Sequence, residues 1–373
     1  MINRYLESII EGRMGQGKAI VLFGARQVGK TTMLKNLLEW RDDVLWLNGD
    51  EQDVRNLFEN VSSTMLKTII GKKSVVVIDE AQRISDIGIG IKLITDNIPD
   101  VQVLATGSSS FDLSNKINEP LTGRKLEYWM YPLSFGELVE HHGLLEEKRL
   151  LAHRLIYGSY PDVINNVGDE RMILTELANS YLYKDILMFD KIKKSDKLVK
   201  LLQALAFQMG SEVSYNELAQ TCGLDPKTVE SYVTLLEQSY IIFRLGSFSR
   251  NLRNELKFAR KIYFWDCGIR NAVIGNYQML ESRLDTGALF ENYMVAERLK
   301  KLRYEKSYAK SYFWRSKLKQ EIDYIEEMDG QLAAVEFKWN PNRKAAMPLS
   351  FSRSYPDVDF KVVTRDNFET FLL

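Results

Sequence analysis

The chain is poor in cysteine and has no long hydrophobic run. Only Cys222 and Cys267 occur among 373 residues, too few for a disulfide framework or a zinc site, so a reducing compartment is the default expectation. Nowhere do about 18 apolar residues follow one another, which argues against a membrane-spanning helix. The first residues also have no apolar stretch of signal-peptide length. We therefore expect a cytoplasmic protein without a membrane partner.

Net charge is absent as well, but the charges are unevenly distributed. The 50 lysines and arginines balance 50 aspartates and glutamates, yet residues 240–319 carry 17 basic against 7 acidic side chains. Such an excess indicates either a polyanion-binding region or a charge match with the rest of the chain. The length suggests two or three domains, and 45% hydrophobic residues suffice for sizeable cores.

The most informative stretch is a glycine-rich turn behind an apolar run. Residues 20–23 (IVLF) read as a buried strand, and the spacing G-x-x-x-x-G-K-T follows at once, before an amphipathic helix. Backbone N–H groups of such a turn converge on a phosphate, with the helix N-terminus behind them. The residues expected to bind nucleotide are Gly24, Ala25, Arg26, Gln27, Val28, Gly29, Lys30, Thr31 and Thr32. We expect Lys30 to reach the β- and γ-phosphates and Thr31 to ligate Mg²⁺.

Two acids end a second apolar run. The sequence VVVIDE places Asp79 and Glu80 directly after a strand of β-branched residues, where parallel sheets bind ligands. Asp79 is expected to hold Mg²⁺, and Glu80 to polarise the attacking water. The sequence has no N-K-x-D element for reading guanine, because Asn115-Lys116-Ile117-Asn118 lacks the aspartate. ATP is therefore the expected nucleotide.

Three further polar residues are candidates for the same site. Thr106 and Ser108 follow a third apolar strand, where they could either sense the γ-phosphate or cap a turn. Arg124 could act as an arginine finger, in its own subunit or in a neighbouring one, or could form a surface salt bridge. Strands alternating with helical segments predict an α/β fold with a parallel sheet.

Several of these runs together resemble a widespread prokaryotic group of AAA-type ATPases that carry an uncharacterised, nuclease-like carboxyl-terminal domain. The runs are GARQVGKTT, VVVIDEAQ, LATGSSS, LTGR, YPLSFGEL, GSYP and YLYKDIL. The resemblance covers nearly the whole chain, implies an ATPase core followed by a helical lid, and matches Arg124 to the recurrent Gly-Arg of the group. We expect a P-loop ATPase core at 1–134, a helical lid at 135–207, a winged helix at 208–268 and a nuclease-like domain at 269–373.

The winged helix-turn-helix is expected from residues 211–265. Asp225 can cap a helix that begins at Pro226, and strands are expected at 240–245 and 261–265. Glutamates on the exposed face of that helix, Glu230 and Glu237, disfavour contact with phosphates. The expected wing is basic instead, and its cations are Arg244, Arg250, Arg253, Lys257, Arg260 and Lys261. The module either contacts DNA through this wing or packs within the molecule.

The last hundred residues resemble the PD-(D/E)XK nuclease core. A helix at 287–302 carries Glu291, and strands are expected at 311–314, 321–325 and 332–337. Asp323 lies in the second of these strands, and Glu336 lies in the third, two residues before Lys338. Residues two apart on a strand face the same side, so Glu336 and Lys338 should share one site. The resemblance implies metal binding by Glu291, Asp323 and Glu336, with Lys338 activating the hydroxide. Ile322 stands where the motif has its namesake proline.

The sequence as a whole predicts an enzyme that binds and hydrolyses ATP with Mg²⁺. We expect the hydrolysis to be coupled to action on DNA, non-specific or structure-dependent, with phosphodiester cleavage as a further expectation. The alternative is an ATP-switched scaffold whose carboxyl-terminal domains dock protein partners without cleaving anything. A homo-oligomer is expected, because Arg124 would be most useful at a subunit boundary.

Overall fold

The computed structural model describes residues 2–108, 113, 116–180, 195–249 and 260–373. Their contacts divide the chain into two compact units. Unit 1 comprises the chain up to Pro132 together with Gln238–Tyr240, and unit 2 comprises Leu133–Glu237 and Ile241–Leu373. The run YLYKDIL and the basic residues Arg250, Arg253 and Lys257 lie outside the described residues.

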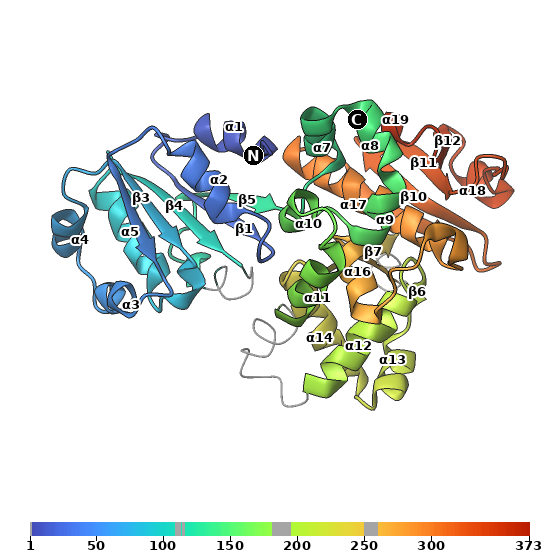
Figure 1. The fold of residues 1–373 in the computed structure, drawn as a ribbon, viewed down its shortest axis with the longest axis horizontal. Helices are drawn as coiled ribbons and strands as arrows, with labels where there is room; N and C mark the ends of the chain where they lie inside the picture. Colours follow the sequence, from blue (N-terminus) through green and yellow to red (C-terminus); the bar gives the residue numbers. More distant parts are fainter. Residues whose placement is uncertain (1, 109–112, 114–115, 181–194, 250–259) are drawn as a thin grey trace. The chain divides into compact units, whose positions relative to one another are not determined.

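Unit 1 is built on a five-stranded sheet, here called sheet A, in which all strands are parallel (Figure 1). The strand order is β2-β3-β4-β1-β5. The strands are β1 (Ala19–Gly24), β2 (Val44–Asn48), β3 (Val75–Asp79), β4 (Gln102–Gly107) and β5 (Lys125–Met130). The helices are α1 (Tyr5–Glu11), α2 (Lys30–Leu37), α3 (Gln52–Phe58), α4 (Ser63–Ile70), the 3-10 turn η1 (Ala81–Arg83) and α5 (Ile87–Asn97). The parallel sheet confirms the predicted α/β class.

Burial explains why these runs form the central strands. Every residue of β1 and β4 is buried, as are the first four residues of β3. A parallel strand with apolar side chains on both faces must be covered on both sides. The helices that connect successive strands of an α/β unit provide this cover. The carboxyl ends of β1, β3 and β4 therefore meet at one edge of sheet A, with the turn after β1 leading straight into α2.

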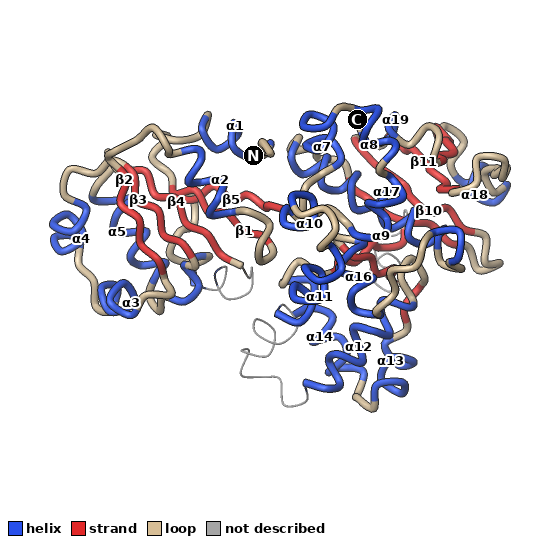
Figure 2. Tube along the Cα trace, viewed as in Figure 1, coloured by secondary structure: helices blue, strands red, loops and turns tan. Residues whose placement is uncertain are grey.

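Unit 2 begins with helices and ends in a second sheet, and Figure 2 shows helices α11 to α14 gathered away from strands β10 and β11. Its helices are α7 (Phe135–His142), α8 (Leu144–Arg149), α9 (Leu151–Tyr157), α10 (Pro161–Asn165), α11 (Glu170–Ser180), α12 (Ser195–Phe207), α13 (Tyr215–Cys222), α14 (Pro226–Gln238), α16 (Cys267–Ile274), η3 (Leu280–Ser282), α17 (Thr286–Tyr304), α18 (Leu349–Ser354) and α19 (Glu369–Leu372). Helix α13 ends at Gly223 in the left-handed conformation, the predicted turn before α14.

The second sheet, sheet B, has seven strands in the order β12-β11-β10-β9-β7-β8-β6. They are β6 (Glu212–Val213), β7 (Ile242–Ser247), β8 (Arg260–Phe264), β9 (Lys310–Arg315), β10 (Glu321–Met328), β11 (Gln331–Lys338) and β12 (Val358–Thr364). Strands β7 and β9 pair in parallel, with Gly246 opposite Tyr312 and Ser247 opposite Phe313. The strands expected as a wing and those expected in the nuclease-like domain thus belong to one sheet.

The carboxyl-terminal part of sheet B follows the order helix, three strands, helix, strand. Helix α17 precedes the antiparallel strands β9, β10 and β11, and α18 connects β11 to the parallel strand β12. Phe248, Ile322, Ile325, Ala334 and Phe351 belong to one buried hydrophobic cluster in this part of the chain. No helix within the described ranges is long and apolar enough to cross a membrane.

Candidate functional site

The phosphate-loop residues form a tight turn between β1 and α2. Gly24 lies against β5, and a Cβ atom there would stand 2.2 Å from the carbonyl oxygen of Met130, so only glycine fits. Gly29 has a φ of 95° and Gln27 a φ of 58°, the left-handed conformations that curl the loop. The Lys30 ammonium donates to the carbonyl oxygens of Gly24 and Ala25, at 2.8 Å each. The lysine therefore reaches over the loop that its motif predicts.

Arg4 supports the loop from outside the motif, and the sequence did not single it out. Its guanidinium is buried and donates to the carbonyl oxygen of Val28 at 2.6 Å and to that of Tyr131 at 2.7 Å. Val28 lies in the phosphate loop, and Tyr131 directly follows the last residue of β5. Arg4 thus ties the segment before α1 to the phosphate loop and to the end of β5.

Thr31, Asp79 and Thr106 meet at the carboxyl edge of sheet A. The Thr31 hydroxyl donates to Asp79 Oδ2 at 2.8 Å, and the Thr106 hydroxyl donates to Asp79 Oδ1. The Thr106 oxygen also accepts from the Glu80 backbone N–H at 3.2 Å. A hydroxyl beside a carboxylate is the oxygen donor set that Mg²⁺ prefers. Thr31 and Asp79 therefore fit the predicted metal role, while Thr106 orients Asp79.

Glu80 is held in an unusual backbone conformation by its neighbours. Its φ of 49° and ψ of 41° are left-handed, a cost that functional residues often carry. The Gln82 amide donates to Glu80 Oε2 at 2.5 Å and to Ser108 Oγ at 2.9 Å, and Ser108 lies 3.3 Å from the same carboxylate oxygen. Gln82 is thus a further site residue. Its place two positions after Glu80, in DEAQ, was the only signal in the sequence.

Arg124 lies at the opposite edge of sheet A from the phosphate loop. Its backbone carbonyl accepts from the N–H of Ala19, the first residue of β1, and five residue steps of about 3.3 Å separate Ala19 from Gly24. Its Nε donates to Asp96 at 2.6 Å in a half-exposed ion pair. At roughly 16 Å along β1, Arg124 is too far away to serve its own phosphate loop. Arg124 could act as an arginine finger only on the nucleotide of a neighbouring subunit.

The predicted nuclease-like residues do come together on sheet B. Lys338 Nζ lies 2.6 Å from Glu336 Oε2 and 3.6 Å from Asp323 Oδ2, and the Phe337 N–H donates to Asp323 at 2.9 Å. Burial, and then the neighbouring Asp323, raise the pKa of Glu336. The lysine stands between the two carboxylates that were expected to hold a metal.

Glu291 joins this group from α17 and has two partners on β8. Lys261 Nζ lies 3.0 Å from Glu291 Oε1, and the Tyr263 hydroxyl donates to the same oxygen at 2.7 Å. Burial raises the pKa of Glu291 to about 7, with Lys261 opposing and Asp323 adding to the shift. Among the described residues, no three acidic, histidine or cysteine side chains are placed to hold a metal ion.

Lys261 was expected among the cations of a wing that either contacts DNA or packs within the molecule, and the structure favours packing. Its side chain is 1% exposed, and it also forms an ion pair with Glu321 of β10. Arg244 does not present a free charge either, because its Nε donates to Glu237 at 2.8 Å. The other expected wing cations, apart from the half-buried Arg260, lie outside the described residues.

Internal pairing also accounts for part of the basic excess of residues 240–319. Several of the acidic partners lie outside that stretch, as the alternative of an internal charge match requires. Among the described residues, the side-chain ion pairs that cross its boundaries are Arg244–Glu237, Lys261–Glu321, Arg298–Glu326, Arg315–Glu212 and Arg315–Glu321. Four of these cations are therefore matched by acids elsewhere in unit 2.

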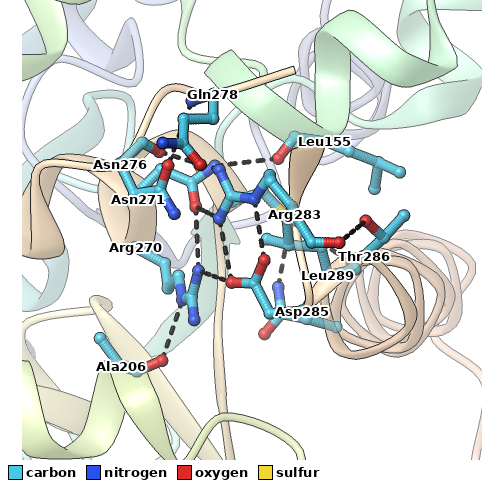
Figure 3. Close-up of polar contacts among 12 residues, drawn as sticks. Leu155, Ala206, Arg270, Asn271, Asn276, Gln278, Arg283, Asp285, Thr286 and Leu289 are labelled. Carbon is cyan, nitrogen blue, oxygen red and sulfur yellow. Dashed lines mark hydrogen bonds and ion pairs between the residues drawn. The ribbon is translucent and has the colours of Figure 1, made fainter. Parts of the chain in front are cut away.

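One buried polar network, shown in Figure 3, joins α16 to the start of α17. The Arg270 and Arg283 guanidiniums both donate to the Asp285 carboxylate, at 2.5 Å and at 2.8 and 3.0 Å. Asn271 Oδ1 accepts from the same two arginines, at 3.1 and 2.9 Å. The arginines are 2% and 7% exposed. Burial alone would raise the pKa of Asp285, but Arg283 and Arg270 together lower that pKa to about 2.

Comparison with known proteins divides the chain into three matched regions. Residues 16–139 match an AAA domain. Residues 148–279 and 286–370 match two domains of unknown function, DUF8612 and DUF4143. The Arg270–Arg283–Asp285 network lies where these last two regions meet.

The similar curated proteins are uncharacterized. One from Methanocaldococcus jannaschii is 23% identical over 262 residues, which are 64% of this chain and 59% of that protein. The alignment thus spans less than two thirds of that relative's length. One from Mycobacterium tuberculosis is 24% identical over 327 residues, covering 86% of this chain and 70% of the relative.

Among solved structures, the Walker-type ATPase PABY2304 of Pyrococcus abyssi is similar at 15% identity. The match covers 74% of this chain and 96% of that one, with a TM-score of 0.49. The AAA match, the phosphate-loop geometry and the parallel sheet A together identify residues 16–139 as an AAA-type P-loop ATPase domain.

Proposed function

We propose that this chain binds MgATP and hydrolyses it at the carboxyl edge of sheet A. The observation that carries the proposal is the joint placement of Thr31, Asp79 and Glu80 beside a phosphate loop covered by Lys30. These are the parts that phosphoryl transfer to water requires: a cradle, a cation, a metal ligand pair and a base. The Gln82 and Ser108 contacts hold the base in place.

Each residue has a separate task. The Lys30 ammonium exchanges the carbonyls of Gly24 and Ala25 for the phosphates of the nucleotide. Thr31 and Asp79 would hold Mg²⁺, which neutralises charge on the phosphate oxygens when bound. Glu80 accepts a hydrogen bond from the attacking water, and its orientation depends on Gln82. Thr106 and Ser108 are close enough to these carboxylates to respond when a γ-phosphate arrives.

Replacing Lys30 with alanine tests the binding step. Loss of a charge-assisted hydrogen bond is worth about 1.5–3 kcal/mol, so we expect ATP affinity to fall by roughly 10- to 100-fold. Equilibrium titration with a fluorescent ATP analogue measures it, with Lys35→Ala, on the same helix, as the matched control. Unchanged affinity in a folded Lys30→Ala protein would contradict the proposed site.

Arg124 supports a proposal about assembly. Since it cannot reach its own phosphate loop, a finger role requires a homo-oligomer in which one subunit offers Arg124 to the nucleotide of the next. Its exposed pair with Asp96 would then be exchanged for the phosphate, at small cost because exposed pairs contribute little.

The ATPase is proposed to switch what unit 2 binds. The internal pairing of Arg244 and Lys261 favours a docking module for a protein partner. DNA is the second candidate, since α13, α14, β7 and β8 have the order of the expected winged helix. Exposed lysines at both ends of β9 also favour it. We do not propose metal-dependent cleavage, because lysines already pair with the carboxylates that would hold the metal.

Salt dependence separates the two candidates. If DNA is the partner, log Kd plotted against log salt gives a steep line with a slope of about 0.9 per phosphate contact. Replacing Lys317 and Lys319, exposed at the β9–β10 turn, with alanine is then expected to lower that slope by about 2. The measurement is fluorescence anisotropy on short DNA duplexes. A Lys72→Ala/Lys73→Ala protein, changed on unit 1, is the control. If no salt-sensitive DNA binding is found, the docking module for a protein partner is the candidate that remains.

A further inference from the structure

The carboxyl-terminal sheet holds a group of four acidic residues with two lysines inserted among them. We call the acids Glu291, Glu321, Asp323 and Glu336 the carboxylate cluster. They come from α17, β10 and β11. Lys338 was expected here from its motif, whereas Lys261 comes from β8, a strand that precedes α17 and was expected elsewhere. The two lysines divide the carboxylates between them.

Lys261 is fixed in place from several sides. Its ammonium lies 3.0 Å from Glu291 Oε1 and forms an ion pair with Glu321. It also lies 5.4 Å from the centre of the buried Phe313 ring, a favourable position for a cation. Only 1% of its side chain is exposed. The Lys261 ammonium, with carboxylates on one side and an aromatic ring near it, is therefore part of the protein interior.

Lys338 occupies the other half of the cluster, with 23% of its side chain exposed. Its ammonium lies 2.6 Å from Glu336 and 3.6 Å from Asp323, and Asp323 further accepts the Phe337 N–H. Each of the four carboxylates therefore has a lysine within ion-pair distance. Arg315 adds a third cation, 3.7 Å from Glu321 Oε2.

This donor set does not fit the divalent metal that a nuclease-like core implies. Mg²⁺ needs oxygen ligands at about 2.1 Å and keeps several waters. An ammonium ion on each carboxylate pair supplies the positive charge already and repels a second cation. The described residues accordingly contain no group of three acidic side chains arranged for a metal.

We propose that the Lys261 ammonium is the resident cation of the carboxylate cluster. It excludes divalent metal ions and locks β8 onto α17 and β10. The cluster then serves as a metal-free polar core that joins the strands after α14 to the nuclease-like strands. Metal-assisted phosphodiester cleavage does not occur there. This inference concerns unit 2 alone and does not depend on ATP hydrolysis.

The test is titration of the nucleotide-free, full-length chain with MnCl₂ by isothermal calorimetry. The wild-type chain is compared with Glu291→Gln/Asp323→Asn, which removes two carboxylates, and with Lys261→Met, which keeps the side-chain length but removes the charge. We expect the first two proteins to show the same weak binding. Lys261→Met is expected to bind about one Mn²⁺ ion at least ~10-fold more tightly, and adding Glu291→Gln/Asp323→Asn should abolish that gain.

Two results would overturn the proposal. One is Mn²⁺ binding by the wild-type chain that Glu291→Gln/Asp323→Asn removes, since the cluster would then be a metal site as it stands. The other is a folded Lys261→Met protein, checked by circular dichroism, that gains no Mn²⁺ binding. If Lys261→Met fails to fold, the comparison of wild type with Glu291→Gln/Asp323→Asn decides alone: equal titrations support the proposal.

Discussion

Glu80→Gln is expected to lower the rate of ATP hydrolysis by about 10²- to 10⁴-fold, the usual contribution of a positioned general base. Glutamine keeps the shape of the side chain and can still contact Gln82 and Ser108. It cannot accept a proton from water, so the loss should fall on kcat. ATP affinity should stay within about twofold, because Lys30 and Thr31 make the expected contacts to the phosphates.

Steady-state phosphate release together with equilibrium ATP binding separates the two effects. Glu59→Gln, at an exposed position of unit 1, is the matched control and should hydrolyse ATP like the wild type. A Glu80→Gln protein that hydrolyses ATP at an unchanged rate would remove Glu80 from the chemistry. Loss of binding and rate together would instead indicate that Glu80 shapes the phosphate loop.

The features of unit 1 that could be predicted are those that a short stretch of sequence contains completely. The phosphate loop needs only β1, a turn and α2, and its glycines are required by the backbone that the loop adopts. The acids after β3 follow from the rule that parallel strands end at one edge. Local patterns were therefore enough to bring Lys30, Thr31, Asp79 and Glu80 together.

The residues that sequence reasoning missed act across long separations. Arg4 reaches the Tyr131 carbonyl, 127 positions away, and no periodicity or spacing records such a contact. Lys261 read as a wing cation because basic residues surround it in sequence. Only the pairing of β7 with β9 brings β8 into the sheet that carries Glu321. A charge excess counted along the chain cannot distinguish exposed lysines from those that neutralise buried carboxylates.

Asp285→Asn is expected to destabilise unit 2 strongly. Asp285 is the carboxylate shared by the buried Arg270 and Arg283, and asparagine leaves both guanidiniums without a counter-charge. Removing one partner of a buried ion pair costs about 3–5 kcal/mol. The three other acceptors of the arginines in Figure 3, Asn271 Oδ1 and the carbonyls of Ala206 and Asn276, carry no charge. Urea unfolding followed by circular dichroism measures the loss. Asp359→Asn is the control, since that exposed aspartate pairs only with the exposed Lys361, and it should unfold near the wild-type midpoint.

The pKa of Asp285 predicts how the difference in unfolding free energy between wild type and Asp285→Asn depends on pH. Because the folded pKa of Asp285 is about 2, below the ordinary value of 3.8, its ionised form stabilises the fold above pH 4 or so. That stabilisation, roughly 2 kcal/mol, is lost as the pH falls from about 4 towards 2. The gap between wild type and Asp285→Asn should therefore be constant near neutral pH and narrow below pH 4. A gap that stayed constant into acid would mean that Asp285 acts by shape, through its hydrogen bonds alone, rather than by its charge.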